Sequence, residues 1–193
     1  MGKTNTAWLI IVILIIVVAL ILFKVFKSQS SPISIEPGYT IPEGFTVYSN
    51  RPLGLSAFAY PNDWNVMKGR DEYEIAFVSP NREASVSIEQ LYLEQGEKLN
   101  YETYLTRLLS EDPSVQFEKT NEQIKNINGK DWLLFGGRLT IGSVSRQVQY
   151  GIYITSDPSG RQFYRFLLDS TKDRIASDTA LFTTMLESAR FFE

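Results

Sequence analysis

The side chains of this chain that could do chemistry are carboxylates, lysines, serines and tyrosines, because the sequence contains no histidine and no cysteine. A Ser-His relay, a thiolate nucleophile, an imidazole base and the usual ligand sets of zinc are therefore excluded. Asp169 with Asp173, and Glu72 with Glu74, could in principle supply an acid and a base. Their spacing gives no sign that they converge, and solvated turns explain them better. We expect no catalytic residue, no metal ligand and no bound cofactor.

Two glycine-containing segments share features with ligand-binding loops but favour simpler interpretations. Residues 126–131 (NINGKD) match part of a calcium loop, yet no glutamate follows at the required offset. Asn128-Gly129 is instead a strong hairpin signal, because both residues accept positive φ. Gly136-Gly137 lacks the Lys-Ser or Lys-Thr pair of a phosphate loop, so we expect a bulge or a close crossing of strands there.

The distribution of charge argues against a nucleic-acid partner. Residues 1–27 contain three lysines and no acid, which leaves 16 basic and 22 acidic residues beyond them and a net charge near −6. Binding to phosphate backbones calls for clustered Lys and Arg, whereas here the two signs alternate along the chain. The remaining length can bury enough apolar surface to fold without disulfides.

An apolar run near the N-terminus predicts a transmembrane anchor over residues 7–26, after a short tail of residues 1–6. Ala7 to Phe23 carry no polar side chain, and the run continues past Lys24 to Phe26. A helix needs about 20 such residues to cross ~30 Å of hydrocarbon. We place Trp8, Lys24 and Lys27 at the membrane interfaces, where amphipathic rings and long cationic stems are favoured.

Cleavage as a secretory signal is the alternative to a retained anchor. The apolar run exceeds the usual signal core of about 7 to 15 residues, and no Ala-x-Ala follows it. The flanking positive charges nearly tie, so the positive-inside rule does not set the orientation. We expect the long C-terminal portion outside the cytoplasm, with the reverse topology open. Residues 27–44 are rich in Pro, Gly and Ser and predict an extended linker.

Residues 45–193 predict one globular domain of the α+β class. Alternation at Val148, Tyr150 and Ile152 indicates a half-buried strand, and Asp157-Pro158-Ser159-Gly160 predicts the turn of a hairpin. Near Gln90 and Leu91 the alternation changes, as though a strand were bulged there. The other predicted strands are Leu55–Tyr60, Glu72–Ser79, Ala84–Glu94, Val115–Ile127, Lys130–Ile141 and Arg161–Asp169, and the predicted helices are Tyr101–Ser110 and Arg174–Ala189.

The segment Leu55–Val66 (LSAFAYPNDWNV) and the closing LFTTMLESARF resemble the PsbP-like family. In the first segment Pro61 is suited to end a strand, Asn62-Asp63 to form a turn, and Trp64 to fill the sheet edge. The resemblance covers most of the domain and implies an α/β/α sandwich, an antiparallel sheet flanked by helices. It also implies a non-catalytic accessory or docking role. The chain departs from the family by its membrane anchor, and no functional residue transfers to it.

These observations predict a single-pass, membrane-tethered binding or accessory module outside the cytoplasm. The anchor would contact membrane lipid, while a groove or edge of the sheet would dock on a protein partner or a small ligand. Two alternatives remain. A carboxylate-dependent hydrolase requires at least two acids converging in a pocket, whereas a structural assembly subunit of an envelope complex would show a flat apolar patch.

Overall fold

The structure, a computed structural model, describes residues 38–93, 115–154 and 162–192. The chain divides after Ser34 into two units, and all described residues belong to the second. Of the helices in the described ranges, none has the length and apolar character that crossing a bilayer requires.

Several predicted features lie outside the described residues. They are the anchor over residues 7–26 with its interface residues Trp8, Lys24 and Lys27, most of the linker, the helix Tyr101–Ser110 and the turn at residues 157–160.

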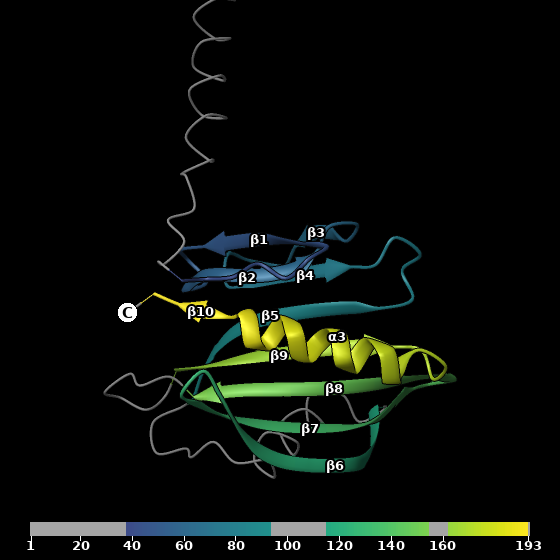
Figure 1. Cartoon of the computed structure of the whole chain (residues 1–193). Coiled ribbons are helices and arrows are strands. Elements are labelled where there is room, and N and C mark those ends of the chain that lie inside the picture. The colour runs from purple at the N-terminus through teal and green to yellow at the C-terminus, as the bar shows by residue number, and fades with distance from the viewer. Residues whose placement is uncertain (1–37, 94–114, 155–161, 193) are drawn as a thin grey trace, which may run out of the picture. The chain divides into compact units, whose positions relative to one another are not determined.

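Two antiparallel sheets make up most of the described chain (Figure 1). The larger has seven strands in the spatial order β3-β4-β5-β9-β8-β7-β6, and the smaller has the order β1-β2-β10. The strands are β1 (Phe45–Asn50), β2 (Leu55–Pro61), β3 (Asn65–Lys68), β4 (Glu74–Val78), β5 (Ser85–Tyr92), β6 (Val115–Ile127), β7 (Lys130–Ile141), β8 (Val144–Ile154), β9 (Gln162–Ser170) and β10 (Arg190–Phe191). The helix in the described residues is α3 (Ile175–Ser188).

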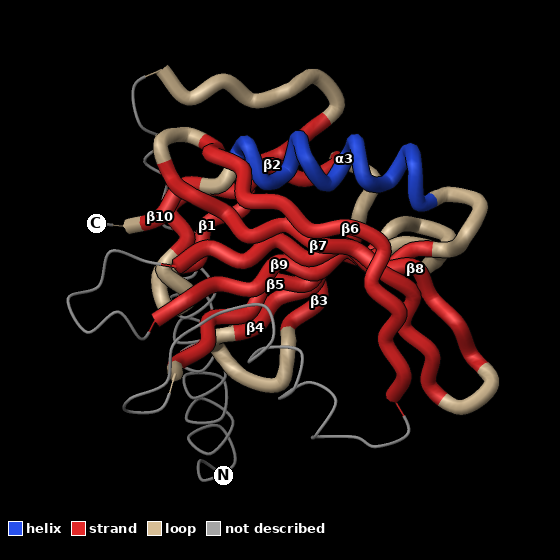
Figure 2. The backbone as a smooth tube through the Cα atoms, turned by 90° about the horizontal axis from the view of Figure 1, so that it is seen from below, coloured by secondary structure: helices blue, strands red, loops and turns tan. Residues whose placement is uncertain are grey.

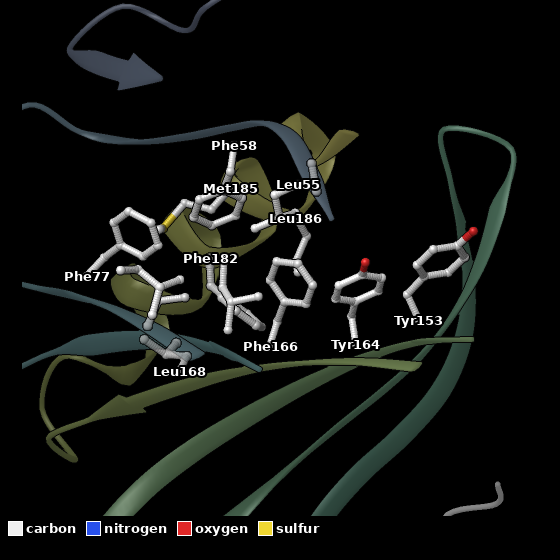
Figure 3. Close-up of a cluster of buried hydrophobic side chains, with 14 of the residues drawn as sticks. Leu55, Phe58, Phe77, Tyr153, Tyr164, Phe166, Leu168, Phe182, Met185 and Leu186 are labelled. Carbon is white, nitrogen blue, oxygen red and sulfur yellow. The ribbon is translucent and has the colours of Figure 1, made fainter. Parts of the chain in front are cut away.

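The small sheet and α3 cover one face of the large sheet, which we call the inner face. Seen from below, α3 lies along one side of that sheet (Figure 2). Phe58 of β2 contacts Phe77 of β4 and Phe166 of β9, with ring centroids 5.1 Å and 5.7 Å apart. Side chains from β2, the large sheet and α3 point toward one another in this layer (Figure 3). Burial of these apolar surfaces is the main force that holds the layers together.

The opposite, outer face of the large sheet carries a second buried cluster, made by Leu93, Phe135, Val148, Tyr150, Ile152 and Phe163. The predicted strand and its buried residues Val148, Tyr150 and Ile152 are confirmed. The prediction that the opposite side of the strand is solvated was wrong at Gly151 and Tyr153 of β8. Its alternate residues are also covered, because Tyr153 is 7% exposed and stacks on Trp132, and Gly151 lies beneath Leu186. A strand with a cover on both faces loses the simple alternation of one buried and one solvated side.

The predicted strand bounds for β6 and β7 are confirmed, and so is the hairpin between them. Asn128 and Gly129 have φ values of 54° and 75°, which a type I′ turn requires. The predicted bulge near Gln90 was wrong, because β5 pairs with β9 in unbroken register from Ser85 to Tyr92. Leu91 packs on the outer cluster while Gln90 is buried on the inner face, and this two-sided burial produced the misleading pattern.

At Gly136-Gly137, β7 approaches β6 closely, as predicted. The bulge at this point lies in β6 and not in β7. The register between β6 and β7 shifts between Lys119 and Asn121, opposite the two glycines. A Cβ on Gly137 would lie 2.4 Å from the Phe117 ring. Only a residue without a side chain allows this approach.

The fold is thus α+β and mostly antiparallel, as expected, but with two sheets instead of one. Sequence reasoning did not find β1, β3 or β10. β10 is only two residues long, and its partner β2 lies far away in the sequence, so no local pattern marks the pairing.

Candidate functional site

A groove of about 410 Å³ opens between β1 and the turn that joins β3 to β4. Tyr48, Asn50 and Pro52 line one side, and the other side is formed by Lys68, Gly69, Arg70, Asp71, Glu72, Glu74 and Ile75. We call it the rim groove. Its walls come from both sheets, so it exists only because the small sheet packs against the large one.

Hydrogen bonds from backbone N–H groups to carboxylates and to a carbonyl fix the conformation of the β3–β4 turn. The Glu74 carboxylate accepts the Arg70 N–H at 3.0 Å, and the Asp71 carboxylate accepts the Tyr73 N–H at 2.8 Å. The Gly69 N–H donates to the Glu74 carbonyl at 3.1 Å. A Cβ on Gly69 would lie 2.4 Å from the Glu74 Cβ, so glycine is needed for the turn to close. The acids of the turn therefore order its backbone.

The wall contributed by β1 is also ordered before any ligand binds. Asn50 donates to the Tyr48 hydroxyl at 3.0 Å and accepts the Leu53 N–H at 3.1 Å. Burial raises the pKa of the Tyr48 hydroxyl, and the hydrogen bond with Asn50 partly opposes this rise. The Tyr48 ring rests edge-on against Phe77, with centroids 5.4 Å apart. A wall fixed in this way loses little side-chain entropy on binding.

Behind the turn lies a partly buried ion pair of the outer face. Glu89 of β5 stands opposite Glu74 of β4 on one side and Arg165 of β9 on the other, and it pairs with Arg165. Burial raises the pKa of the Glu89 carboxyl above its ordinary value of 4.5. Arg165 opposes the rise, and the charges of Glu74 and Asp71 add to it.

We expect Glu89 to make the stability of the domain depend on pH. Because the folded state raises the Glu89 pKa, it binds this proton more tightly than the unfolded chain does. The resulting stabilisation is complete below the unfolded pKa and is lost as the pH rises through the folded pKa. Urea unfolding measures the free energy of unfolding of the wild type and of Glu89→Gln at each pH. The wild-type value minus the Glu89→Gln value should become larger as the pH is lowered from 7 toward about 4.5.

Glu43→Gln, at an exposed position, is the matched control for the loss of one carboxylate. A Glu89→Gln difference that stays flat over this range, or that decreases toward acid, would show that the pKa is not raised.

Exposed aromatic and apolar side chains flank the rim groove. Met67, Tyr73 and Tyr92 are 53%, 41% and 58% exposed. The Gln90 N–H donates to the Tyr73 carbonyl at 3.0 Å, and the Gln90 side-chain amide donates to the Tyr92 hydroxyl at 3.3 Å. Gln90 of β5 therefore holds the Tyr73 backbone and orients the Tyr92 side chain. A hydrogen bond with Glu72 raises the pKa of the Tyr73 hydroxyl. Tyr, Met and Arg are the residue types enriched at protein interfaces.

The acids considered as candidates from the sequence are only partly brought together. Glu72 and Glu74 line the rim groove, whereas Asp169 pairs with Arg146 at 2.6 Å on the outer face, and Asp173 is exposed. The structure adds Asp71 to the groove, but the Asp71 and Glu74 carboxylates already accept backbone N–H groups. Within residues 38–93, 115–154 and 162–192, acidic side chains form no cluster of three that could hold a metal ion.

The calcium-loop resemblance at residues 126–131 is explained by the hairpin. The Asn126 amide donates to the Asp131 carboxylate at 2.8 Å, and the Asn126 oxygen accepts the Gly129 N–H at 3.1 Å. These oxygens are used to close the turn between β6 and β7.

Sequence reasoning did not find the rim groove. The signal available was the run Lys68-Gly69-Arg70-Asp71, a charged turn with a glycine between two short apolar stretches. Nothing in the sequence places this turn beside Tyr48 and Asn50, because their contact depends on how the two sheets pack.

Comparison with solved structures defines the fold. Cyanobacterial PsbP from Synechocystis sp. PCC 6803 (CyanoP) is similar with a TM-score of 0.59 and 19% identity, and the match covers 84% of this chain and 100% of that one. The Saccharomyces cerevisiae Ran-binding protein Mog1p is similar with a TM-score of 0.50 and 9% identity, over 80% of this chain and 97% of that one. No family model and no curated protein sequence matches the chain.

The chain therefore has a PsbP-like fold, which confirms the resemblance seen in Leu55–Val66. At these identities the similarity establishes the fold alone.

Proposed function

We propose that this protein is a membrane-tethered, non-catalytic module that docks on a protein partner through the rim groove, outside the cytoplasm. The observation that carries the docking proposal is the set of exposed side chains on the strands and turn next to the groove, namely Met67 of β3, Tyr73 of the β3–β4 turn and Tyr92 of β5. Such side chains supply most of the binding energy in protein interfaces when a partner removes them from water.

The rim groove favours a protein partner over a small molecule. Five of its ten lining residues are charged and it is only partly enclosed, whereas pockets for small molecules are enclosed and lined mainly by apolar and aromatic side chains. The prearranged turn carries both basic and acidic side chains, Lys68 and Arg70 followed by Asp71 and Glu72. Together with the neighbouring tyrosines and methionine, it can form the polar rim and the apolar anchor of an interface with a folded partner. The similar fold of Mog1p, described as a Ran-binding protein, is a precedent for protein binding by this architecture.

The tether and its orientation are supported by the sequence. Residues 7–26 are long and apolar enough to span a bilayer. The Pro- and Gly-rich linker would hold the domain up to about 50 Å from the membrane at full extension. A short N-terminal tail before an uncleaved anchor favours export of the long C-terminal portion.

We expect the full chain to remain in membranes after carbonate washing and to co-purify with a partner in mild detergent. The double variant Tyr73→Ala/Tyr92→Ala should reduce the recovered partner about tenfold or more, because a buried aromatic anchor contributes about 2 kcal/mol or more and about 1.4 kcal/mol is a factor of ten. Quantitative mass spectrometry of the captured complex measures this ratio.

Ile141→Ala/Val144→Ala is the matched control, since these side chains are 48% and 59% exposed at the end of the β7–β8 hairpin, away from the groove. Equal loss in both double variants, or recovery of the wild type alone, would contradict docking at the rim groove. Release by carbonate would contradict the tether.

A further inference from the structure

Among the strands that the structure describes, β6 is the last in the seven-stranded sheet, and the edge that does not pair with β7 faces away from the other strands (Figure 1). In the view from below, β6 runs in front of the other strands (Figure 2). It is 13 residues long, and the side chains of residues 118–124 are all exposed. A long edge strand offers a row of backbone N–H and C=O groups to another strand.

The bulge at Thr120 changes which residues of β6 lie on each face of the sheet. Before the bulge, Phe117 packs on Phe135 and Tyr150 of the outer face, with ring centroids 6.3 Å and 6.1 Å away. After the bulge, Lys125 pairs at 3.5 Å with Glu187 of α3, which covers the inner face. Odd-numbered residues are therefore outer before Thr120 and inner after it.

This reversal makes the edge of β6 complementary to itself. Consider two copies of β6 that run antiparallel about a two-fold axis between Thr120 and Asn121. Apart from these two central residues, each residue from 116 to 125 then faces a residue of the second copy whose side chain lies on the same face of the sheet. The pairs are Lys119 with Glu122, Phe117 with Ile124, Glu118 with Gln123 and Gln116 with Lys125. An unbulged strand with the same residues would place the two side chains of each pair on opposite faces.

The backbone agrees with the same register. In a two-residue hairpin the flanking residues Ile127 and Lys130 form a hydrogen-bonded pair, so Glu122, Ile124 and Asn126 direct their N–H and C=O groups outward. Beyond the bulge the outward residues are Phe117 and Lys119. In the self-complementary register, residues whose N–H and C=O groups point outward face residues of the second copy whose N–H and C=O groups also point outward. The two strands can therefore form backbone hydrogen bonds on both sides of the axis.

Side-chain chemistry selects this register over its neighbours. Lys119 and Glu122 already form an ion pair within one chain at 2.8 Å, so two copies would place two ammonium groups and two carboxylates alternately around the axis. Ile124, which is 75% exposed, would cover the half-buried Phe117 of the second copy. A shift by two residues would place Lys119 against Ile124 and Phe117 against Asn126, which removes both matches.

We propose that β6 is a homodimer interface, through which two copies of this chain join their seven-stranded sheets into one continuous antiparallel sheet. Bulges and edge lysines ordinarily protect a sheet from such pairing. Here the bulge keeps the faces aligned and the lysine meets a glutamate, so the edge accepts a copy of itself in one register. This surface is separate from the rim groove, and its test does not depend on the proposed function.

The absence of cysteine from the chain allows a direct test by disulfide trapping. Full-length Glu118→Cys and Gln123→Cys chains, mixed in mild detergent under oxidising conditions, should form a crosslinked heterodimer. These residues would be a non-hydrogen-bonded pair, whose Cα separation of about 4.5 Å suits a disulfide. The mixture of Glu118→Cys with Lys125→Cys is the out-of-register control and should crosslink at least about tenfold more slowly, because its Cβ atoms would be about 7 Å apart.

A charge exchange provides the second measurement. Lys119→Glu would place a carboxylate opposite Glu122 of the second copy, so the dimer dissociation constant from sedimentation should rise about tenfold or more. Lys119→Glu/Glu122→Lys should restore the wild-type value. Equal crosslinking in and out of register would overturn the proposal. So would a wild-type chain that sediments as a monomer at every concentration, or a Lys119→Glu variant that dimerises like the wild type.

Discussion

Replacing Gly54 by alanine is expected to destabilise the domain by roughly 2–5 kcal/mol. Gly54 has a φ of +76°, and a Cβ built on it would lie 2.0 Å from the Tyr164 hydroxyl oxygen. The left-handed conformation costs an alanine about 1–2 kcal/mol, and overpacking a buried site typically costs about 1–3 kcal/mol. Tyr164 is 3% exposed, and its ring lies tilted against the Phe191 ring of β10 with centroids 4.6 Å apart, so it has little room to withdraw. Urea unfolding measures the loss.

Two variants separate the causes of the Gly54 effect. Gly44 has a φ of +80° but no atom within 4 Å of its Cβ position, so Gly44→Ala should show the backbone contribution alone, about 1–2 kcal/mol. Adding Tyr164→Phe to Gly54→Ala removes the clashing oxygen and should recover part of the stability. If Gly54→Ala is no worse than Gly44→Ala, then the close approach of Gly54 to Tyr164 is not part of the fold.

Asp178→Ala is expected to cost about 2–4 kcal/mol of unfolding free energy. The Asp178 carboxylate is 3% exposed, accepts the Ser170 hydroxyl at 2.6 Å and pairs with Arg174 at 3.3 Å. Ser170 is fully buried, so the substitution leaves its hydroxyl without that acceptor. Breaking a buried pair costs about 3–5 kcal/mol, and we expect a lower value because the Arg174 side chain is 39% exposed and can turn to water.

Asp178 also helps to define where α3 begins. Arg174 occupies the N-cap position and makes no side-chain capping hydrogen bond, so the first turn of α3 relies on Asp178 for its acidic group. Arg174, which pairs with Asp178, also pairs with Glu83 of the β4–β5 turn, with nitrogen and oxygen 3.2 Å apart. Losing Asp178 should therefore loosen both the helix start and that turn, which hydrogen exchange at these amides would show.

Asp173→Ala is the matched control for Asp178, because Asp173 is exposed in the turn before α3, and it should change stability by less than about 0.5 kcal/mol. Asp178→Asn keeps an acceptor for Ser170 without the charge and should fall between the two. Equal unfolding midpoints for Asp178→Ala and Asp173→Ala would show that the buried network adds nothing to stability.

The elements that were predicted well are those set by neighbours in the chain. The bounds of β6 and β7 follow from Asn128-Gly129, because positive φ at both positions closes a two-residue hairpin whatever surrounds it. The close approach at Gly136-Gly137 was visible because only glycine tolerates it. The start of α3 was predicted within one residue from the spacing of its apolar side chains.

The rim groove and the reversal of faces along β6 could not be predicted in this way. Asn50 and Arg70 line one groove because two sheets pack together, and no residue pattern near either one reports that contact. The bulge at Thr120 follows from how β6 pairs with the glycines of β7, and a shift of one residue reverses every side chain beyond it. The β5 pattern was misread for a related reason, since Gln90 is buried on one face while Leu91 packs against the cluster on the other.

By itself, the sequence determined the chemistry that the chain lacks, an apolar run long enough to span a membrane, and the hairpin of β6 and β7. These properties depend on composition and on residues within a few positions of one another. Only the tertiary structure decided that there are two sheets, that a charged turn and β1 form a groove, and that the edge of β6 is complementary to itself. Those outcomes depend on which apolar faces pack against one another. The hydrophobic effect is not directional, so the sequence of one segment does not specify which other segment will cover it.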